Sequence, residues 1–207
     1  MELKKRKLIL FDIDHTLINT DIIKKKTIND ICKYFKVDED KVKKAKDKYI
    51  NSLNYVNDLN PNEMLEAIGE ELNLSLIDLK KIYYNPKIFL ESIYPETIRT
   101  LKSVDKEKYV LGIYSEGWDF FQKYKLESTG LIKFFEENWI YILRRKIEKN
   151  VALLPNLTMI VDDNIEVINE LKKKKNIIPI WLNRKNKTID KTIKTIFDLE
   201  QLLEIIN

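Results

Sequence analysis

The sequence predicts an α/β fold built on a parallel sheet, with a helical segment inserted after the first strand. Short apolar runs rich in β-branched and aromatic residues recur along the chain, and helical patterns lie between them. The runs are continuous and do not alternate with polar residues, which is typical of strands covered on both faces. Alternating strands and helices indicate a parallel sheet.

The expected strands and helices follow one another in a regular order. Helical spacing of apolar residues appears after Pro95, after Asn164 and at the C-terminus, where Asp198 and Gln201 resemble a capping box. This order predicts a sheet whose helices lie in the crossovers between strands. The expected strands are Lys7–Ile13, Tyr109–Tyr114, Trp139–Leu143, Leu157–Val161 and Ile177–Leu182.

One interval breaks this order, because about 95 residues separate the first expected strand from the second. Apolar residues inside it recur with helical periodicity, notably after Pro61. Ser75 and Asp78 resemble the start of a further helix. We therefore expect a core formed by residues 1–17 and 92–207 and an all-helical inserted domain formed by residues 18–91.

Composition places the chain among ordinary folded proteins. It has 207 residues, of which 44% are hydrophobic and 34% charged, and a formal net charge of +4. The lysines are spread along the chain, so we expect a solvated surface and no nucleic-acid partner. The single cysteine, Cys32, excludes an intrachain disulfide and a cysteine-rich metal site. With no signal-peptide core and no membrane span, the expected location is cytoplasmic, as a monomer or homodimer.

Paired acids end two of the expected strands. Asp12 and Asp14 end the first, and Asp162 and Asp163 end the fourth. Ligands of open α/β sheets bind at the carboxyl ends of strands, so neighbouring strands would bring these four carboxylates together. Like charges at such a distance repel one another, and hard oxygen ligands without cysteine favour Mg²⁺ as the balancing cation. A single aspartate would be explained by helix capping, but two such pairs indicate a metal site.

The segment Phe11–Leu17 resembles the first motif of the haloacid dehalogenase superfamily, an apolar strand followed by Asp-x-Asp-x-Thr. The resemblance covers essentially the whole chain. It implies a Rossmann-like three-layer core with a helical C1-type cap, in which the inserted domain is the cap. Further matching segments follow in the family's order: Tyr94-Pro95, Tyr114–Gly117, the region around Lys146, Ile160–Asp163 and Trp181–Arg184.

The resemblance also implies the roles of the acids. Asp12 would attack phosphorus and form an aspartyl-phosphate, and Asp14 would protonate the leaving oxygen and then activate water. We expect Asp14 to hold a proton because another carboxylate lies beside it. Mg²⁺ would be held by the Asp12 carboxylate, the Asp14 backbone carbonyl and the pair Asp162 and Asp163.

The same resemblance gives substrate contacts to three further residues. Ser115 would donate to a phosphoryl oxygen, and Thr16 would steady the nucleophile loop. A lysine would complete the site, and Lys146 fits best, although the proline that often follows it in the family is missing. Its substitutes are Arg144, Arg145 and Lys149. For His15, the only histidine, we favour a role in shaping the loop or at the edge of the substrate over one in catalysis.

These residues together predict a phosphatase that hydrolyses a small phosphorylated metabolite with Mg²⁺. A phosphomutase would use the same site, with a sugar hydroxyl in place of water. A dehalogenase is disfavoured because its chemistry needs no acid at the position of Asp14. The remaining alternative is a non-catalytic interaction protein that keeps the scaffold, because a fold does not fix a function.

Overall fold

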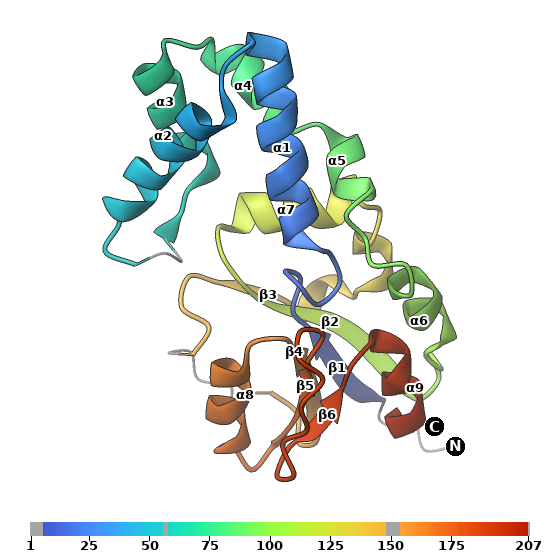
Figure 1. Ribbon diagram of the computed structural model, residues 1–207. Helices are drawn as coiled ribbons and strands as arrows, with labels where there is room; N and C mark the ends of the chain where they lie inside the picture. The colour runs from blue at the N-terminus through green and yellow to red at the C-terminus, as the bar shows by residue number, and fades with distance from the viewer. Residues whose placement is uncertain (1–5, 56–57, 148–153, 207) are drawn as a thin grey trace.

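A six-stranded parallel sheet forms the centre of the computed structural model, which describes residues 6–55, 58–147 and 154–206 (Figure 1). The strand order is β3-β2-β1-β4-β5-β6. β1 therefore lies between β2 and β4, with Leu10 opposite Gly112 on one side and Ile160 on the other. The strands are β1 (Lys7–Phe11), β2 (Tyr109–Glu116), β3 (Ile140–Leu143), β4 (Thr158–Asp162), β5 (Ile177–Leu182) and β6 (Lys194–Ile196).

The sheet confirms the predicted α/β class. Each of the five expected strands is present and its ends lie within two residues of the expected ones. The sequence reasoning missed β6, which is only three residues long and begins with an exposed lysine, Lys194. So short a segment contains too few residues to show a periodicity.

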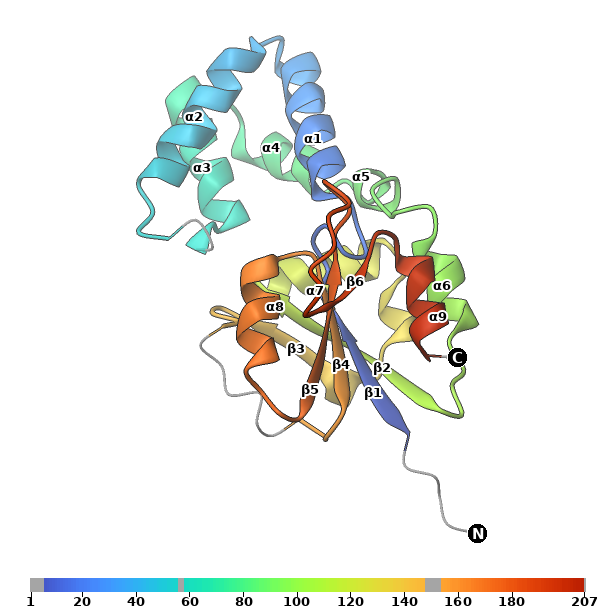
Figure 2. The ribbon, with the colours of Figure 1, turned by 60° about the horizontal axis from the view of Figure 1, so that its bottom comes forward.

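The side chains of β1 alternate between two apolar layers, as the pleat of a strand requires. Ile9 and Phe11 pack into the larger layer, whereas Leu8 and Leu10 pack into the smaller one. Helices α6, α7 and α9 contribute to the larger layer and α8 covers the opposite face (Figure 2). These helices are α6 (Thr97–Ser103), α7 (Asp119–Ser128), α8 (Ile165–Lys172) and α9 (Leu202–Ile206), with 3-10 turns at Ile132–Phe134, Glu137–Trp139 and Leu199–Gln201.

Helices α1 to α5 occupy the described part of the interval between β1 and α6 (Figure 1). Each begins after a residue whose side chain accepts a hydrogen bond from the backbone of the first turn, and the Ser75 cap expected from the sequence is among them. In the described ranges no helix has the length and apolar character needed to cross a bilayer. The helices are α1 (Thr20–Phe35), α2 (Glu39–Asn51), α3 (Pro61–Leu72), α4 (Leu76–Tyr83) and α5 (Pro86–Leu90).

The inserted helices have an apolar cluster of their own. Ile31, Val42, Leu65 and Leu79, from α1 to α4, pack together in it. α5 differs, because its Ile88 and Phe89 belong to the larger layer of the sheet. By packing, the helical domain is α1 to α4, while the predicted limits at residues 18 and 91 stay a prediction.

At Gly112, β2 packs closely against neighbouring residues, so a substitution there is a test of the packing of the sheet. A Cβ atom at this position would lie 2.4 Å from the Trp139 carbonyl oxygen and 2.7 Å from Leu10 Cδ2. We expect Gly112→Ala to lower the free energy of unfolding by about 1–3 kcal/mol, because buried backbone must move. Urea denaturation measures the change. The control is Gly130→Asn, at a left-handed position that asparagine tolerates and where no atom lies within 4 Å; an equal loss in both variants would contradict the prediction.

Candidate active site

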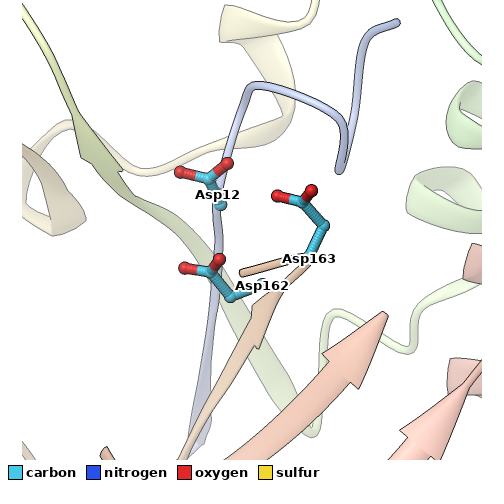
Figure 3. Close-up of side chains that lie close together, drawn as sticks. All are labelled: Asp12, Asp162 and Asp163. Atoms are coloured by element: carbon cyan, nitrogen blue, oxygen red, sulfur yellow. The ribbon is translucent and has the colours of Figure 1, made fainter. Parts of the chain in front are cut away.

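The carboxyl ends of β2, β1 and β4 meet at one edge of the sheet and bring the candidate residues together. Asp12 directly follows β1, and its backbone N–H donates to the Val161 carbonyl oxygen of β4 at 2.9 Å. Asp162 is the last residue of β4. Figure 3 shows the carboxylates of Asp12, Asp162 and Asp163 facing a common space. Each of the three offers a carboxylate oxygen within 4.8 Å of those of the other two.

Two side chains hold the Asp12 carboxylate in place. Ser115 Oγ donates a hydrogen bond to Asp12 Oδ1 at 3.0 Å, and Lys146 Nζ donates to the same oxygen at 2.7 Å. All three residues are buried. Ser115 belongs to β2, next to β1, so the order of the strands places its hydroxyl beside Asp12. The carboxylate therefore has a fixed orientation, as a nucleophile requires.

Of the three candidate basic residues that the structure describes, Arg144, Arg145 and Lys146, it is Lys146 whose side chain reaches the acids. Its ammonium group forms ion pairs with both Asp12 and Asp162. Arg144 and Arg145 instead bind Asp58, which lies between α2 and α3. Lys149 lies outside the described residues. The sequence alone could not show which of the adjacent basic residues contacts the acids, whereas the directions of their side chains in the structure do.

The loop that carries Lys146 is itself anchored. Tyr114 Oη donates to the Lys146 carbonyl oxygen at 2.8 Å, and the Lys146 backbone N–H donates to Glu116 Oε2 at 3.3 Å. Both partners come from β2. The end of β2 thus positions the serine and the lysine on the same side of Asp12.

Burial and mutual repulsion disfavour the charged forms of the clustered acids. Burial, together with the charges of Asp162 and Asp14, raises the pKa of Asp12 to about 7, although Lys146 opposes the shift. Burial and the Asp12 charge raise the pKa of Asp163 to about 6. The pKa of Asp162 is also raised, chiefly by burial. One ammonium group therefore does not balance three carboxylates, and a cation bound among them would stabilise their charged forms.

The donor set of this cluster fits Mg²⁺. Its ligands are carboxylate oxygens, which hard divalent cations prefer. The cluster contains neither histidine nor cysteine, so zinc fits it less well. Asp12, Asp162 and Asp163 are the side chains that could hold the ion.

Asp14 does not belong to this cluster of acids, and three side chains bind its carboxylate. Lys125 Nζ contacts both of its carboxylate oxygens, at 2.7 and 2.8 Å. Gln122 Nε2 donates to Oδ2 at 2.9 Å, and Thr20 Oγ1 donates to Oδ1 at 2.6 Å. Asp14 is thus joined to α7 by Gln122 and Lys125 and to the first residue of α1 by Thr20.

The pKa of Asp14 is opposite to the expectation from the sequence. Burial raises it, but the charge of Lys125 and the three donors outweigh burial and lower the pKa to about 2. The expectation that a neighbouring carboxylate would keep Asp14 protonated is wrong for this conformation, because it considered Asp12 and not Lys125. Asp12 is the acid whose pKa is raised.

Gln122 and Lys125 are site residues that sequence reasoning missed. Both are buried, and a lysine is rarely buried unless it has a partner, which here is Asp14. The two residues lie three positions apart on one face of α7. The sequence offered one signal for these residues: a polar pair at this spacing in a helix that begins just after the segment Tyr114–Gly117. It was weak, because exposed helix faces carry the same pattern.

Thr16 and His15 occupy the loop after the nucleophile. Thr16 is fully buried, and its hydroxyl has no hydrogen-bond partner within the described ranges, so its predicted contact with the loop or substrate stays a prediction. His15 adopts a left-handed backbone with φ of 59°. Its backbone N–H donates to the Ile18 carbonyl oxygen at 2.8 Å, which closes a tight turn. This geometry supports the loop-shaping role.

Arg184, which lies two residues after the end of β5, contacts the same loop. Its Nη2 donates to the Thr16 carbonyl oxygen at 3.0 Å, and its Nη1 pairs with Glu96 at 2.6 Å. The guanidinium also stacks 3.7 Å above the ring of Tyr94. The two segments at Tyr94-Pro95 and Trp181–Arg184, far apart in the sequence, therefore meet behind the nucleophile loop.

A cleft of about 930 Å³ opens over the acids. Asp12, Asp14, Lys146 and Asp162 contribute to its lining, and further polar groups such as Lys185 extend it. Its volume falls within the usual range for a small-molecule site. The arrangement can bind an anionic group against Lys146 and a cation among the acids.

Asp58, between α2 and α3, connects the helical domain to the two arginines that precede Lys146. Its carboxylate accepts hydrogen bonds from Arg144 at 2.7 Å and from Arg145 at 2.8 and 2.7 Å. Arg144 also stacks 4.0 Å above Trp118, whose indole N–H donates to the Asp58 carbonyl oxygen at 3.3 Å. The Asp58 contacts thus join the helical domain to the loop that carries Lys146.

Three solved structures similar to this chain share its whole architecture. A putative haloacid dehalogenase-like hydrolase from Burkholderia xenovorans LB400 is 17% identical, with 97% of each chain covered and a TM-score of 0.72. A HAD phosphatase from Thermococcus onnurineus is 21% identical, with 97% of this chain and 98% of that chain covered and a TM-score of 0.66. The putative HAD-hydrolase YfnB from Bacillus subtilis, bound to magnesium, is 16% identical, with 99% and 100% covered and a TM-score of 0.64.

At these identities the similarity shows the fold alone, and the matched structures also include dehalogenases and a putative beta-phosphoglucomutase. No curated protein sequence matches the chain. The family comparison goes further, because residues 9–142, well over half of the chain, match the haloacid dehalogenase-like hydrolases. The chain therefore belongs to the haloacid dehalogenase-like hydrolase family.

Proposed function

We propose that this hydrolase is a magnesium-dependent phosphatase that acts on a small phosphate monoester through an aspartyl-phosphate. The observation that supports it most is the Asp12 carboxylate, fixed by Ser115 and Lys146 beside Asp162 and Asp163. A phosphoryl group carries charge that must be balanced on several sides in the transition state. The ammonium of Lys146 and a cation among the acids supply that balance.

In the first step, an Asp12 carboxylate oxygen attacks phosphorus, and the bond between phosphorus and the ester oxygen breaks. The departing alkoxide takes a proton from Asp14 and leaves as an alcohol. Lys146 holds the nucleophile and donates a hydrogen bond to a phosphoryl oxygen, and the single hydroxyl proton of Ser115 turns from Asp12 to a second phosphoryl oxygen when the phosphate binds. Asp14 is ionised while Lys125 binds it; the negative charge of an arriving phosphate group favours uptake of a proton from solution by Asp14, and this is the proton that the alkoxide receives.

In the second step, water attacks the same phosphorus from the side of Asp14. Asp14, now a carboxylate again, accepts the proton of the water, and the bond between Asp12 and phosphorus breaks. Inorganic phosphate leaves and both acids return to their starting states. When bound, Mg²⁺ would neutralise part of the phosphoryl charge and lessen its repulsion from Asp12.

Asp14 also favours a phosphatase over a dehalogenase. An alkoxide is a strong base and leaves readily only when it is protonated, whereas a halide ion leaves without a proton. An acid two residues after the nucleophile therefore has a task in ester hydrolysis and none in halide displacement. Three donors orient its carboxylate in this chain, which is more than a residue without a role requires.

We expect Asp12→Asn to abolish Mg²⁺-dependent release of phosphate from an aryl phosphate, because the amide is a poor nucleophile. The rate should fall by at least a thousandfold, measured as inorganic phosphate with 4-nitrophenyl phosphate as substrate. Asp47→Asn, at an exposed position of α2, is the matched control and should retain the wild-type rate. Activity that survives Asp12→Asn, or an isomerised sugar phosphate formed in place of free phosphate, would reject the proposal.

The raised pKa of Asp12 predicts how magnesium affects stability at different pH values. A carboxyl whose pKa is 3.8 in the unfolded chain and about 7 in the folded one favours folding below pH 4, and this contribution is lost as pH rises through 7. Mg²⁺ binds the ionised form. We therefore expect Mg²⁺ to raise the melting temperature more at pH 8 than at pH 5. Differential scanning fluorimetry measures this, and an equal shift at both pH values would contradict it; Asp12→Asn should show a smaller shift at pH 8.

The ion pair between Lys125 and Asp14 should stabilise the fold. Lys125→Met leaves a largely buried carboxylate without its cation, so the free energy of unfolding at pH 7 should fall by roughly 3 kcal/mol. The depressed pKa of Asp14 gives stability that is present above pH 4 and lost as pH falls through about 2. Urea denaturation of both single variants and of the double variant with Asp14→Asn measures the coupling. Strictly additive losses would show that the pair contributes nothing.

A further inference from the structure

A second cavity, of about 440 Å³, lies inside the helical domain and reaches the catalytic edge of the sheet. One wall is α1, the opposite wall is formed by α2 and α3, and the start of α7 lies below, as the arrangement of these helices in Figure 1 shows. Asp14, His15, Glu116 and Gly117 line both this cavity and the catalytic cleft. The two spaces therefore meet at the proposed general acid.

The walls of this cavity are mainly hydrocarbon. Each of the four helices contributes apolar side chains to the walls, for example Ile23 of α1, Ile50 of α2, Met64 of α3 and Phe121 of α7. The catalytic cleft, by contrast, is lined mostly by charged and amide side chains. An occupant of the inner cavity thus gains by burying apolar surface.

Most polar groups on the walls already have partners. Thr20, Gln122 and Lys125 all bind Asp14. Lys24 and Lys46 are partly exposed and pair with acids on their own helices. Two buried atoms on the walls differ: the Thr27 hydroxyl and Gln122 Oε1 have no hydrogen-bond partner among the described residues. Against the apolar walls, these two neutral atoms are fewer than the hydroxyls of a sugar would need.

The position of Asp14 decides which part of a substrate enters this cavity. The phosphoryl group must lie at Asp12, and Asp14 must reach the ester oxygen on the far side of phosphorus. The alcohol carried by that oxygen then continues past Asp14, away from the acids and toward α1 and α3. Each hydroxyl of a sugar placed there without a partner would cost roughly five- to a hundredfold in affinity.

We propose that the substrate is the phosphate monoester of an apolar alcohol, aromatic or branched aliphatic, whose hydrocarbon part fills the cavity between α1, α2 and α3. This inference rests on the proposed phosphatase function and names its substrate class. It disfavours sugar phosphates and nucleotides. Thr27 and Gln122 are the specificity residues for a polar atom on the hydrocarbon part.

The test compares substrates and a wall variant. We expect 2-naphthyl phosphate to be hydrolysed with a kcat/KM at least tenfold above that of glucose 6-phosphate or a nucleoside monophosphate. Ile50→Gln puts an amide into the half-buried wall and should lower kcat/KM for 2-naphthyl phosphate about tenfold. Methyl phosphate is the reference substrate, because a methyl group does not reach α2, and the ratio of the 2-naphthyl phosphate rate to the methyl phosphate rate should fall in this variant. The matched control is Ile50→Leu, which keeps the wall apolar and the wild-type ratio of the two rates.

Binding of 2-naphthol, the product alcohol, separates the two proposals because it needs no catalysis. Calorimetry should show saturable binding to the wild type and binding weakened about tenfold in Ile50→Gln. Binding of this kind supports the cavity even if no phosphate ester is hydrolysed, a result that would reject the phosphatase alone. The cavity proposal is overturned if 2-naphthol does not bind, if Ile50→Gln binds it as tightly as the wild type, or if glucose 6-phosphate is the better substrate.

Discussion

The ammonium group of Lys146, buried between Asp12 and Asp162, is the interaction on which the rest of the site depends. Moving a charge out of water is costly, and its partners must recover that cost. Here the two acids come from neighbouring strands, β1 and β4, so the parallel order of the sheet supplies both partners at once. The burial that makes the three charges costly also makes the Asp12 carboxylate rigid and available for a cation.

The two acids that follow β1 show how neighbours decide a side chain's chemistry. Asp12 and Asp14 are two residues apart, yet their pKa values shift in opposite directions, to about 7 and about 2. Asp12 shares Lys146 with a second acid, whereas Lys125 pairs with Asp14, which also accepts hydrogen bonds from two neutral donors. The protonated form is thus favoured at Asp12 and the ionised form at Asp14.

Much of this could be predicted from the sequence, because local patterns determine it. Continuous apolar runs predicted five strands, and the acids at their ends predicted which edge of the sheet carries the site. The counter-ion of Asp14 could not be predicted in this way. Lys125 lies 111 residues from Asp14 along the chain, and nothing in a single helix face indicates such a contact. The inner cavity was hidden for a related reason, since apolar residues that line a cavity and those that fill a core have the same periodicity.

The contacts of Asp58 join the helical domain to the acids of the site through a loop of the sheet domain. Asp58 binds Arg144 and Arg145, which directly precede Lys146, so the helical domain and Lys146 are joined by one short loop. The side chains of this cluster are between a quarter and just over a third exposed, unlike Lys146, whose side chain is 3% exposed. Water can replace the lost partners of partly exposed charges, so these ion pairs are weak compared with buried ones. The loss of these ion pairs would therefore cost less than the loss of the pairs between Lys146 and the acids, so the orientation of Asp12 does not depend on the contacts of Asp58.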